Sequence, residues 1–235
     1  MKKISLLLLS VALCGTSFAQ KKGGTKKKTT TTTETTAATN FEGTIAFRME
    51  TKKDTTANLY SVKGNVVRLD QMGKKTGKVE GSFVFDLTGK TIRFVQHSRK
   101  VWGQQKAEGT ANIQGACKAE KTKNTKVLLD KYTCTEYVVT NETEKTKISY
   151  WIYSPDKSGM KFDFFTSVVN LWNRKDKVSV YFRQIKNLPA GSMAFASTEW
   201  LDGKQVGMLE MQKVDAKAMT DADVGIPSDY KEFKQ

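Results

Sequence analysis

The sequence has little of what catalytic and metal sites usually require. Its 235 residues include one histidine, His97, and three cysteines, too few for a typical Cys/His zinc site. It also lacks a glycine-rich phosphate loop, a G-x-S-x-G motif and an H-E-x-x-H motif. We therefore predict a non-catalytic protein without a metal or other cofactor, in which His97 is an ordinary surface residue. One alternative stays open, because four carboxylates could meet in the folded chain to support hydrolysis: Asp163, Asp176, Asp202 and Asp223.

Arginine is also scarce, since only six of the 39 basic residues are Arg. Arg recognises phosphate groups with a bidentate fork, whereas Lys is a solvated point charge. The net charge of +15 therefore indicates first a solvated lysine surface, and second a surface attracted to polyanions, glycans or an anionic envelope. No motif of a nucleic-acid-binding fold is present, and we expect no nucleic acid as a partner.

Long apolar runs are lacking except near the N-terminus. Residues 1–3 are basic at two positions, residues 4–13 are mostly apolar, and Ser17 and Ala19 are small residues at the −3 and −1 positions of a cleavage site. This pattern predicts a secretory signal peptide, residues 1–19, cleaved after Ala19, and hence an exported protein. A membrane anchor would need about 20 apolar residues. Lipidation of Cys14 is disfavoured, because Leu13 stands where a small residue normally precedes a lipidated cysteine.

The next segment, residues 20–40, consists mainly of Lys and Thr and has almost no apolar side chains. It cannot bury a core, so we predict a disordered linker. Residues 41–235 then form a single predicted domain. Loss of Lys2 and Lys3 with the signal peptide would lower the net charge of the mature chain from +15 to +13.

A β-hairpin is predicted where apolar and polar residues alternate on both sides of a Thr88-Gly89 turn. If these two residues form the loop, Phe85 lies opposite Ile92 and Phe83 lies opposite Phe94. Both apolar pairs then share one buried face. A competing register, with Gly89 in a bulge, pairs Asp86 with Lys90. The hydrophobic pattern favours the first register.

The rest of the domain is predicted to contain about ten strands and one helix. Further strands are expected at residues 41–50, 58–63, 66–72, 127–140, 146–153, 178–182, 193–200 and 205–214, with a two-residue turn at Asp202-Gly203. Residues 103–126 are polar and are predicted to form mostly a long loop. Residues 221–231 are predicted to be a short extended tail. The three prolines fall at element boundaries, as a sheet requires.

The helix is predicted from apolar residues spaced three or four apart between Met160 and Trp172, with Pro155 and Asp156 as start signals. Its apolar stripe is wide, so we expect the helix to pack on the concave side of the sheet. The alternative is a mobile lid over a ligand cavity.

Two cysteines, Cys117 and Cys134, remain in the predicted mature chain. An even cysteine count in an exported protein favours a disulfide between them. Two free buried thiols are the alternative, since the geometry of the pair does not follow from the sequence.

Several segments between Phe41 and Lys231 resemble a known family: FEGTIAF, YSVKGNVVRLD, FVFDLTGKTI, YTCTEY and GIPSDYK. They look like the exported bacterial proteins named "domain of unknown function 4412". That family is similar to the periplasmic lipoprotein carriers of the Lol system, which have an open β half-barrel whose concave apolar face is covered by helices and holds acyl chains. The resemblance implies a mainly β, antiparallel half-barrel with one covering helix. It carries over no functional residue, and the single predicted helix is a smaller lid than the Lol carriers have.

The resemblance, together with the predicted export, implies a periplasmic or envelope-associated binding protein for a lipid, an acyl chain or a lipoprotein, and we expect it to act as a monomer. The alternative is a basic cell-surface protein that binds polyanions or glycans. An apolar ligand is expected to contact hairpin and helix residues on the concave face, namely Phe83, Phe85, Ile92, Phe94, Phe165 and Trp172. The competing interpretation is that these six side chains are ordinary core.

Overall fold

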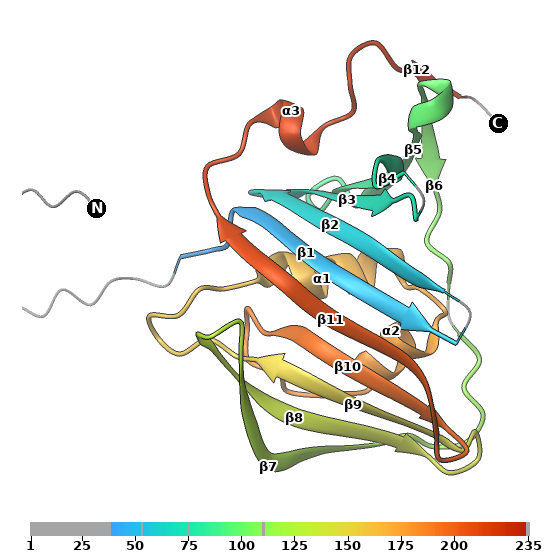
Figure 1. The fold of residues 1–235 in the computed structure, drawn as a ribbon, viewed down its shortest axis with the longest axis vertical. Helices are drawn as coiled ribbons and strands as arrows, with labels where there is room; N and C mark the ends of the chain where they lie inside the picture. Colours follow the sequence, from blue (N-terminus) through green and yellow to red (C-terminus); the bar gives the residue numbers. More distant parts are fainter. Residues whose placement is uncertain (1–38, 53, 75, 110, 234–235) are drawn as a thin grey trace, which may run out of the picture. The chain divides into compact units, whose positions relative to one another are not determined.

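The computed structural model describes residues 39–52, 54–74, 76–109 and 111–233. Within these ranges twelve strands form one open, curved sheet in the order β12-β6-β5-β4-β3-β2-β1-β11-β10-β9-β8-β7 (Figure 1). All neighbours pair antiparallel except β12 and β6. The strands are β1 (Gly43–Thr51), β2 (Thr55–Lys63), β3 (Val66–Met72), β4 (Val79–Asp86), β5 (Thr91–Gln96), β6 (Val101–Gln105), β7 (Lys118–Leu128), β8 (Tyr132–Asn141), β9 (Thr146–Tyr153), β10 (Met193–Leu201), β11 (Lys204–Ala216) and β12 (Lys231–Glu232). The predicted mainly β, open half-barrel fold is confirmed.

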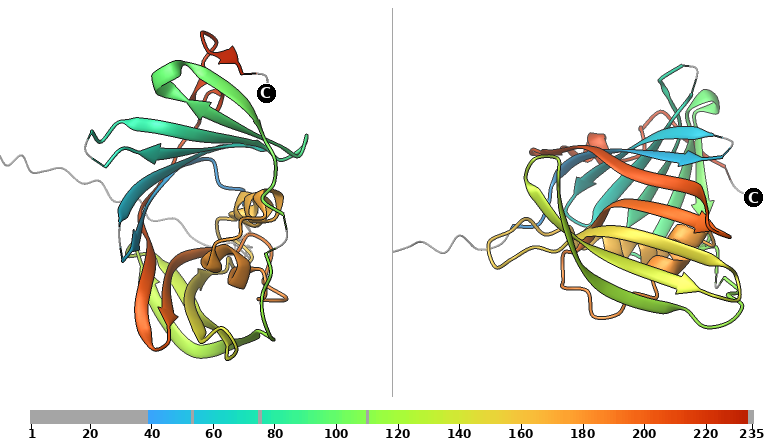
Figure 2. Two further views of the ribbon diagram at one scale, coloured as in Figure 1. Left: turned by 90° about the vertical axis from the view of Figure 1, so that its right-hand side faces the viewer. Right: turned by 60° about the horizontal axis from the view of Figure 1, so that its bottom comes forward.

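The helices are few and short. They are α1 (Asp163–Trp172), α2 (Lys177–Phe182), α3 (Asp221–Val224) and the 3-10 helix η1 (His97–Arg99). Figure 2 shows α1 and α2 on the inner side of the curved sheet. Among the described residues, no helix is both long and apolar enough to cross a membrane. The predicted signal peptide and all but the last two residues of the predicted linker lie outside the described ranges.

The predicted register of the β4–β5 hairpin is confirmed. Phe85 pairs with Ile92 and Phe83 pairs with Phe94, so the competing register is wrong. The turn is longer than predicted and spans residues 87–90. The Gly89 amide donates to Asp86 Oδ1 at 2.8 Å, and the left-handed residue of the turn is Lys90, with φ of 51°. The Asp202-Gly203 turn is confirmed, with φ of 50° and 74° at its two residues, as a tight hairpin requires.

Two predictions around the helices are wrong. Helix α1 begins at Asp163 rather than near Pro155, because Asp156 instead closes a turn by accepting from the Ser158 amide at 3.0 Å. Residues 178–182, predicted as a strand, belong to α2. The Asp176 side chain caps this helix by accepting from the Ser179 amide at 3.0 Å. Such a cap stabilises a helix by about 1 kcal/mol. The strand prediction considered only the alternation of apolar residues, which gives no information about this cap.

The predicted long loop at residues 103–126 is also wrong over its second half, because Lys118 begins strand β7. This strand lies at the edge of the sheet and pairs only with β8. Its side chains are almost all exposed, so it needs no apolar alternation, and its lysines are typical of an edge that avoids further pairing. The predicted strand at residues 127–140 is divided by a turn in which Leu129 and Asp130 have φ of 50° and 58°.

The predicted disulfide is wrong, since Cys117 and Cys134 are both free. The β7–β8 pairing explains why. Cys117 lies beside Asn141, whose Nδ2 is 3.6 Å from the Cys117 sulfur, whereas Cys134 lies seven residues earlier in β8. Seven strand residues span about 23 Å, but a disulfide needs Cα atoms within about 7 Å. Burial raises the pKa of the Cys134 thiol to about 12, so this thiol stays protonated.

The C-terminal segment is a strap across the outer face rather than the simple extended tail that was predicted. It forms the one-turn helix α3, which begins with a capping box made by Thr220 and Asp223. It then continues to β12, which pairs parallel to β6. We call residues 219–233 the C-terminal strap. Two of its apolar side chains, Met219 and Val224, are buried.

Two groups of buried side chains form the core. The first lies between the concave face of the sheet and α1 and includes Ile45, Phe85 and Trp172. The second lies beneath α2 and includes Tyr150 and Tyr181, and Phe165 of α1 packs against both groups. The predicted position of α1, on the concave side of the sheet, is therefore correct.

Candidate functional site

A cavity of about 200 Å3 lies between the concave face of the sheet and the two inner helices. Its helical wall consists of Phe165, Val168, Val169 and Trp172 from α1 and Val178, Ser179 and Phe182 from α2. The opposite wall comes from strands β1, β2, β3, β9, β10 and β11. The walls are mostly apolar, as in binding sites for small apolar molecules.

One row of cross-strand partners runs along the sheet side of this cavity. Strand pairing places its five residues in the order Tyr150, Ser197, Leu209, Met49 and Thr56. The first two are 1% exposed, the next two are partly buried, and Thr56 is exposed. Burial thus decreases from β9 to β2, which places the inner end of the cavity at Ser197 and its mouth at Thr56.

A charged pair that follows α1 also lines the cavity. The Arg174 guanidinium lies 4.7 Å from the centre of the Trp172 ring, and its Nε is 2.9 Å from Asp176 Oδ2. The other oxygen of Asp176 caps α2. Both side chains are about one third exposed, so a polar group could reach them from solvent.

Polar groups also lie inside the cavity. The Tyr150 hydroxyl donates to the Val178 carbonyl at 2.7 Å, whereas the buried Ser197 Oγ has no hydrogen-bond partner among the described residues. Burial raises the pKa of Tyr60 to about 12. Burial and the nearby Asp176 also raise the pKa of Glu199, which lies two residues beyond Ser197 on β10. The interior thus disfavours negative charge.

Helix α2 is held over the cavity by Glu144 in the β8–β9 turn. This carboxylate pairs with Lys177 and accepts from the Tyr181 hydroxyl at 2.6 Å and the Gln114 amide at 3.1 Å. The bonds from Lys177 and Tyr181 lower the pKa of Glu144 to about 2. The cavity roof is therefore attached to the sheet by a carboxylate that stays ionised at neutral pH.

The structure places the six predicted ligand-binding residues in two settings. Phe165 and Trp172 line the cavity. The rings of Phe83 and Phe85 pack on Trp172, with centroids 4.5 and 5.2 Å away. Ile92 is buried beside Phe85, and Phe94 lies near the sheet edge over Gly103, where a Cβ atom would come 2.7 Å from the Phe94 ring. Phe83 and Phe85 thus pack against α1, Ile92 and Phe94 lie opposite them in the hairpin, and none of the four lines the cavity.

Most of the cavity wall was missed from the sequence. Leu209, Met49 and Ser197 meet only because β1 pairs with β11 and β11 with β10. Strands β1 and β11 lie more than 150 residues apart in the chain, and no local pattern reports such a pairing. The one available signal was the strong Asp202-Gly203 turn, which predicted the β10–β11 pair.

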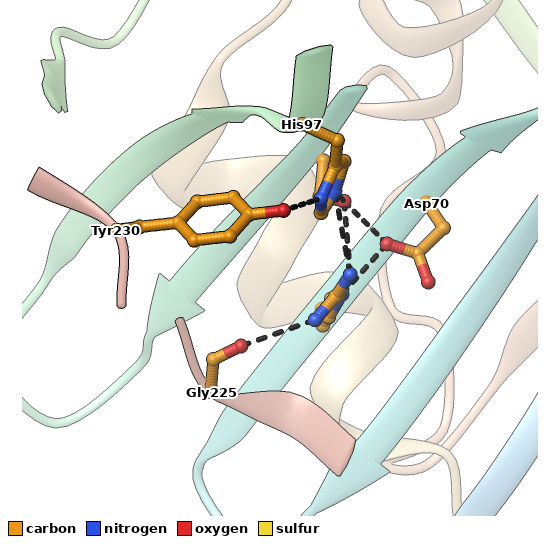
Figure 3. A network of polar contacts seen from close by, with 6 residues as sticks. Asp70, His97, Gly225 and Tyr230 are labelled. Atoms are coloured by element: carbon orange, nitrogen blue, oxygen red, sulfur yellow. Dashed lines mark hydrogen bonds and ion pairs between the residues drawn. The ribbon is translucent and has the colours of Figure 1, made fainter. Parts of the chain in front are cut away.

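A second polar cluster lies on the opposite face of the sheet and fastens the C-terminal strap (Figure 3). Arg68 Nε binds Asp70 Oδ1 at 2.6 Å, and Arg68 Nη1 donates to the Gly225 carbonyl at 3.2 Å. The Ser82 hydroxyl is 2.5 Å from Asp70 Oδ1 and 2.7 Å from His97 Nε2. His97 Nδ1 is 2.9 Å from the Tyr230 hydroxyl. The sequence-based view of His97 as an ordinary surface residue is wrong, because its partners lie far away in the chain.

The same three residue types occur in serine hydrolases, but their arrangement here is different. An ionised carboxylate only accepts hydrogen bonds, so the Ser82 hydroxyl donates to Asp70. His97 Nε2 therefore donates to Ser82, and Tyr230 donates to His97 Nδ1. In a catalytic triad the histidine takes the serine proton and the carboxylate binds the other ring nitrogen. Ser82 is also 2% exposed. This geometry attaches the strap to the sheet and does not activate the serine.

We expect His97 to make stability depend on pH. Burial, and then the charge of Arg68, lower the pKa of His97 in the folded state, while Asp70 partly opposes them. The unfolded state, with a pKa near 6.5, therefore binds a proton more readily. Stability should be full above about pH 6.5 and should fall as the pH drops below that value and through the lowered folded pKa.

Urea unfolding between pH 8 and pH 5 checks this expectation. The wild type should lose stability on acidification, and His97→Gln should lose less over the same range. The comparison separates the effect of His97 from that of Glu199. The raised pKa of Glu199 increases the stability of the folded state as the pH falls, which is opposite to the effect expected of His97. Identical pH profiles for the two proteins would show that His97 does not titrate in this way.

No metal site is evident in the described part of the chain, where no three His, Cys, Asp or Glu side chains lie close enough to hold an ion. No protein-family model and no curated protein matches the sequence.

Weak similarity to solved structures exists. PNGF-II in its C2 crystal form is 12% identical, with a TM-score of 0.41, over 81% of this chain and 30% of that chain. PNGF-II in its P21 crystal form is 10% identical, with a TM-score of 0.41, over 81% of this chain and 31% of that chain. An uncharacterized conserved protein from Thermus thermophilus is 8% identical, with a TM-score of 0.44, over 83% of this chain and 91% of that one. The chain thus spans about a third of PNGF-II, and we base no argument on these similarities.

Proposed function

We propose that this protein is a non-catalytic binding protein of the cell envelope that holds an apolar segment of an amphiphile, such as the acyl chain of a lipid or lipoprotein. The observation that carries the proposal is the apolar cavity between the concave sheet face and helices α1 and α2. The sequence resemblance to the half-barrel lipoprotein carriers supports the same class of ligand. The pattern of residues 1–19 supports export to the envelope.

The size of the cavity limits what it can hold. Its volume of about 200 Å3 is smaller than the roughly 300–1,000 Å3 of typical small-molecule pockets. A cavity of about 150 Å3 already accepts benzene. The site is therefore suited to one ring or to the end of one hydrocarbon chain, with the rest of the amphiphile outside the mouth. Each buried CH2 would contribute about 0.8 kcal/mol.

Leu209 provides a direct test, because it lies in the middle of the row that lines the cavity. In Leu209→Trp the larger side chain should fill the space, and saturable binding of a fluorescent fatty-acid probe should weaken at least tenfold. Leu201→Trp makes the same change on the neighbouring strand at a side chain that is 46% exposed, and it should bind like the wild type. Circular dichroism should first show that both variants fold.

Absence of saturable probe binding to the wild type would refute the proposal. Equal binding by the wild type and a folded Leu209→Trp would place the ligand elsewhere.

A second candidate function, binding of polyanions or glycans, is favoured by strand β7. This edge strand carries four exposed lysines and a single glutamate; the lysines are Lys118, Lys121, Lys123 and Lys126. Binding through such solvated charges should weaken sharply between low and physiological ionic strength. Burial of an acyl chain should change little over that range, so a salt series with the same fatty-acid probe separates the two candidates.

A further inference from the structure

The Ser197 hydroxyl is a buried polar group that the protein itself does not satisfy. Ser197 is 1% exposed and lines the cavity, and its Oγ has no hydrogen-bond partner among the described residues. Its two neighbours in the row do not form a hydrogen bond with this oxygen. Leu209 is apolar, and Tyr150 donates its hydroxyl to the Val178 carbonyl. A buried hydroxyl left unpaired is destabilising by about 1–3 kcal/mol, so a partner is expected from within the cavity.

The position of Ser197 indicates which part of a ligand would reach it. Thr56 at the mouth is three strands away, which corresponds to about 14 Å at the usual strand spacing. Leu209 and Met49 lie between them and present apolar side chains. A molecule that enters at the mouth therefore passes an apolar stretch before it meets the hydroxyl.

The charges near the inner end favour a neutral group there. Glu199 lies on the same face of β10, about 7 Å further along the strand. Burial and Asp176 raise the pKa of Glu199, which indicates that additional negative charge is unfavourable in this region. Arg174, a cation on the cavity wall, is already paired with Asp176 at 2.9 Å.

We propose that the inner end of the cavity selects a neutral hydrogen-bonding group, such as a hydroxyl, carried on an apolar body, and that Ser197 is the residue that recognises it. This inference rests on the proposed function. It narrows the ligand class from hydrocarbon in general to an amphiphile with a second polar group beyond its apolar segment.

The test uses two small probes of nearly equal size, para-fluorophenol and para-fluorotoluene, which differ in a hydroxyl and a methyl group. Both are close to benzene in size and suit the cavity. Their dissociation constants can be measured by fluorine NMR on the full chain. Ser197→Ala should weaken the binding of para-fluorophenol about five- to tenfold, which is the effect of losing one neutral hydrogen bond. The same variant should bind para-fluorotoluene as tightly as the wild type, or slightly more tightly.

Ser61→Ala is the matched control, since Ser61 is also buried in the sheet but lies opposite Arg68 on the outer face. It should alter neither probe. If Ser197→Ala affects both probes equally or neither, for example because a bound water satisfies the hydroxyl, the inference is overturned while the proposed function stands. If neither probe nor the fatty-acid probe binds the wild type, both are overturned.

Discussion

Replacing Phe85 by alanine should lower the free energy of unfolding by about 3–5 kcal/mol, the usual effect of removing a fully buried phenylalanine ring. Phe85 is 0% exposed and packs on Trp172 at 5.2 Å, between Val67 and Ile92 of the adjacent strands. The deletion leaves a void beneath the end of α1, where rigid sheet strands can close it only in part. Guanidinium unfolding followed by circular dichroism measures the change.

Phe94→Ala is the control for this effect. It removes the same ring from the same hairpin, but Phe94 is only partly buried near the sheet edge. Phe94→Ala should therefore lower the free energy of unfolding clearly less than Phe85→Ala does. The two variants also separate the two interpretations of the hairpin. If Phe85→Ala were as stable as the wild type but lost fatty-acid binding, Phe85 would be a ligand contact rather than core.

The second large effect is expected at the ion pair beneath the C-terminal strap. Arg68→Met should lower the free energy of unfolding by about 3–5 kcal/mol, because it leaves the buried Asp70 carboxylate without its cationic partner. The side chains of Arg68 and Asp70 are only 12% and 10% exposed. The change also removes the bond from Arg68 to the Gly225 carbonyl, so the strap should loosen. Urea unfolding gives the stability, and proteolysis of residues 219–233 reports the strap.

Arg48→Met provides the comparison within the same sheet. Arg48 pairs with Glu50 at 3.1 Å, but these side chains are 43% and 36% exposed, and such surface pairs contribute about 0–1 kcal/mol. A double variant, Arg68→Met with Asp70→Leu, should recover much of the loss, since it removes the unpaired charge. Equal, small effects of Arg48→Met and Arg68→Met would show that the strap does not depend on the buried pair.

Local features of the sequence predicted much of the sheet. The alternation around Phe83 and Phe85 identified strands, and the register followed because a shift of one residue would expose their buried face. The Asp202-Gly203 turn predicted the β10–β11 hairpin for a similar reason, since few residues adopt two successive left-handed conformations. Both signals lie within about a dozen residues, so no knowledge of the remaining chain was needed.

Local patterns failed where a distant or non-apolar partner decides the structure. Strand β7 has few apolar residues and forms because β8 supplies its hydrogen bonds. Val178 and Val180 alternate like a strand, but the Asp176 cap and the bonds that Lys177 and Tyr181 donate to Glu144 place them in a helix. The cysteine count favoured a disulfide, and only the hairpin register separates the two thiols.

The sequence by itself therefore determined the mainly β class, the two hairpin registers and the apolar face of α1, because periodicity and turn chemistry act between near neighbours. The half-barrel shape was implied only by the family resemblance. The tertiary structure alone decided where the cavity lies and which polar groups meet. Ser197 reaches the cavity only through strand pairings that join distant parts of the chain, and His97 meets Tyr230 only when the strap crosses the outer face. Such contacts depend on how the whole sheet buries its apolar surface, which no short segment encodes.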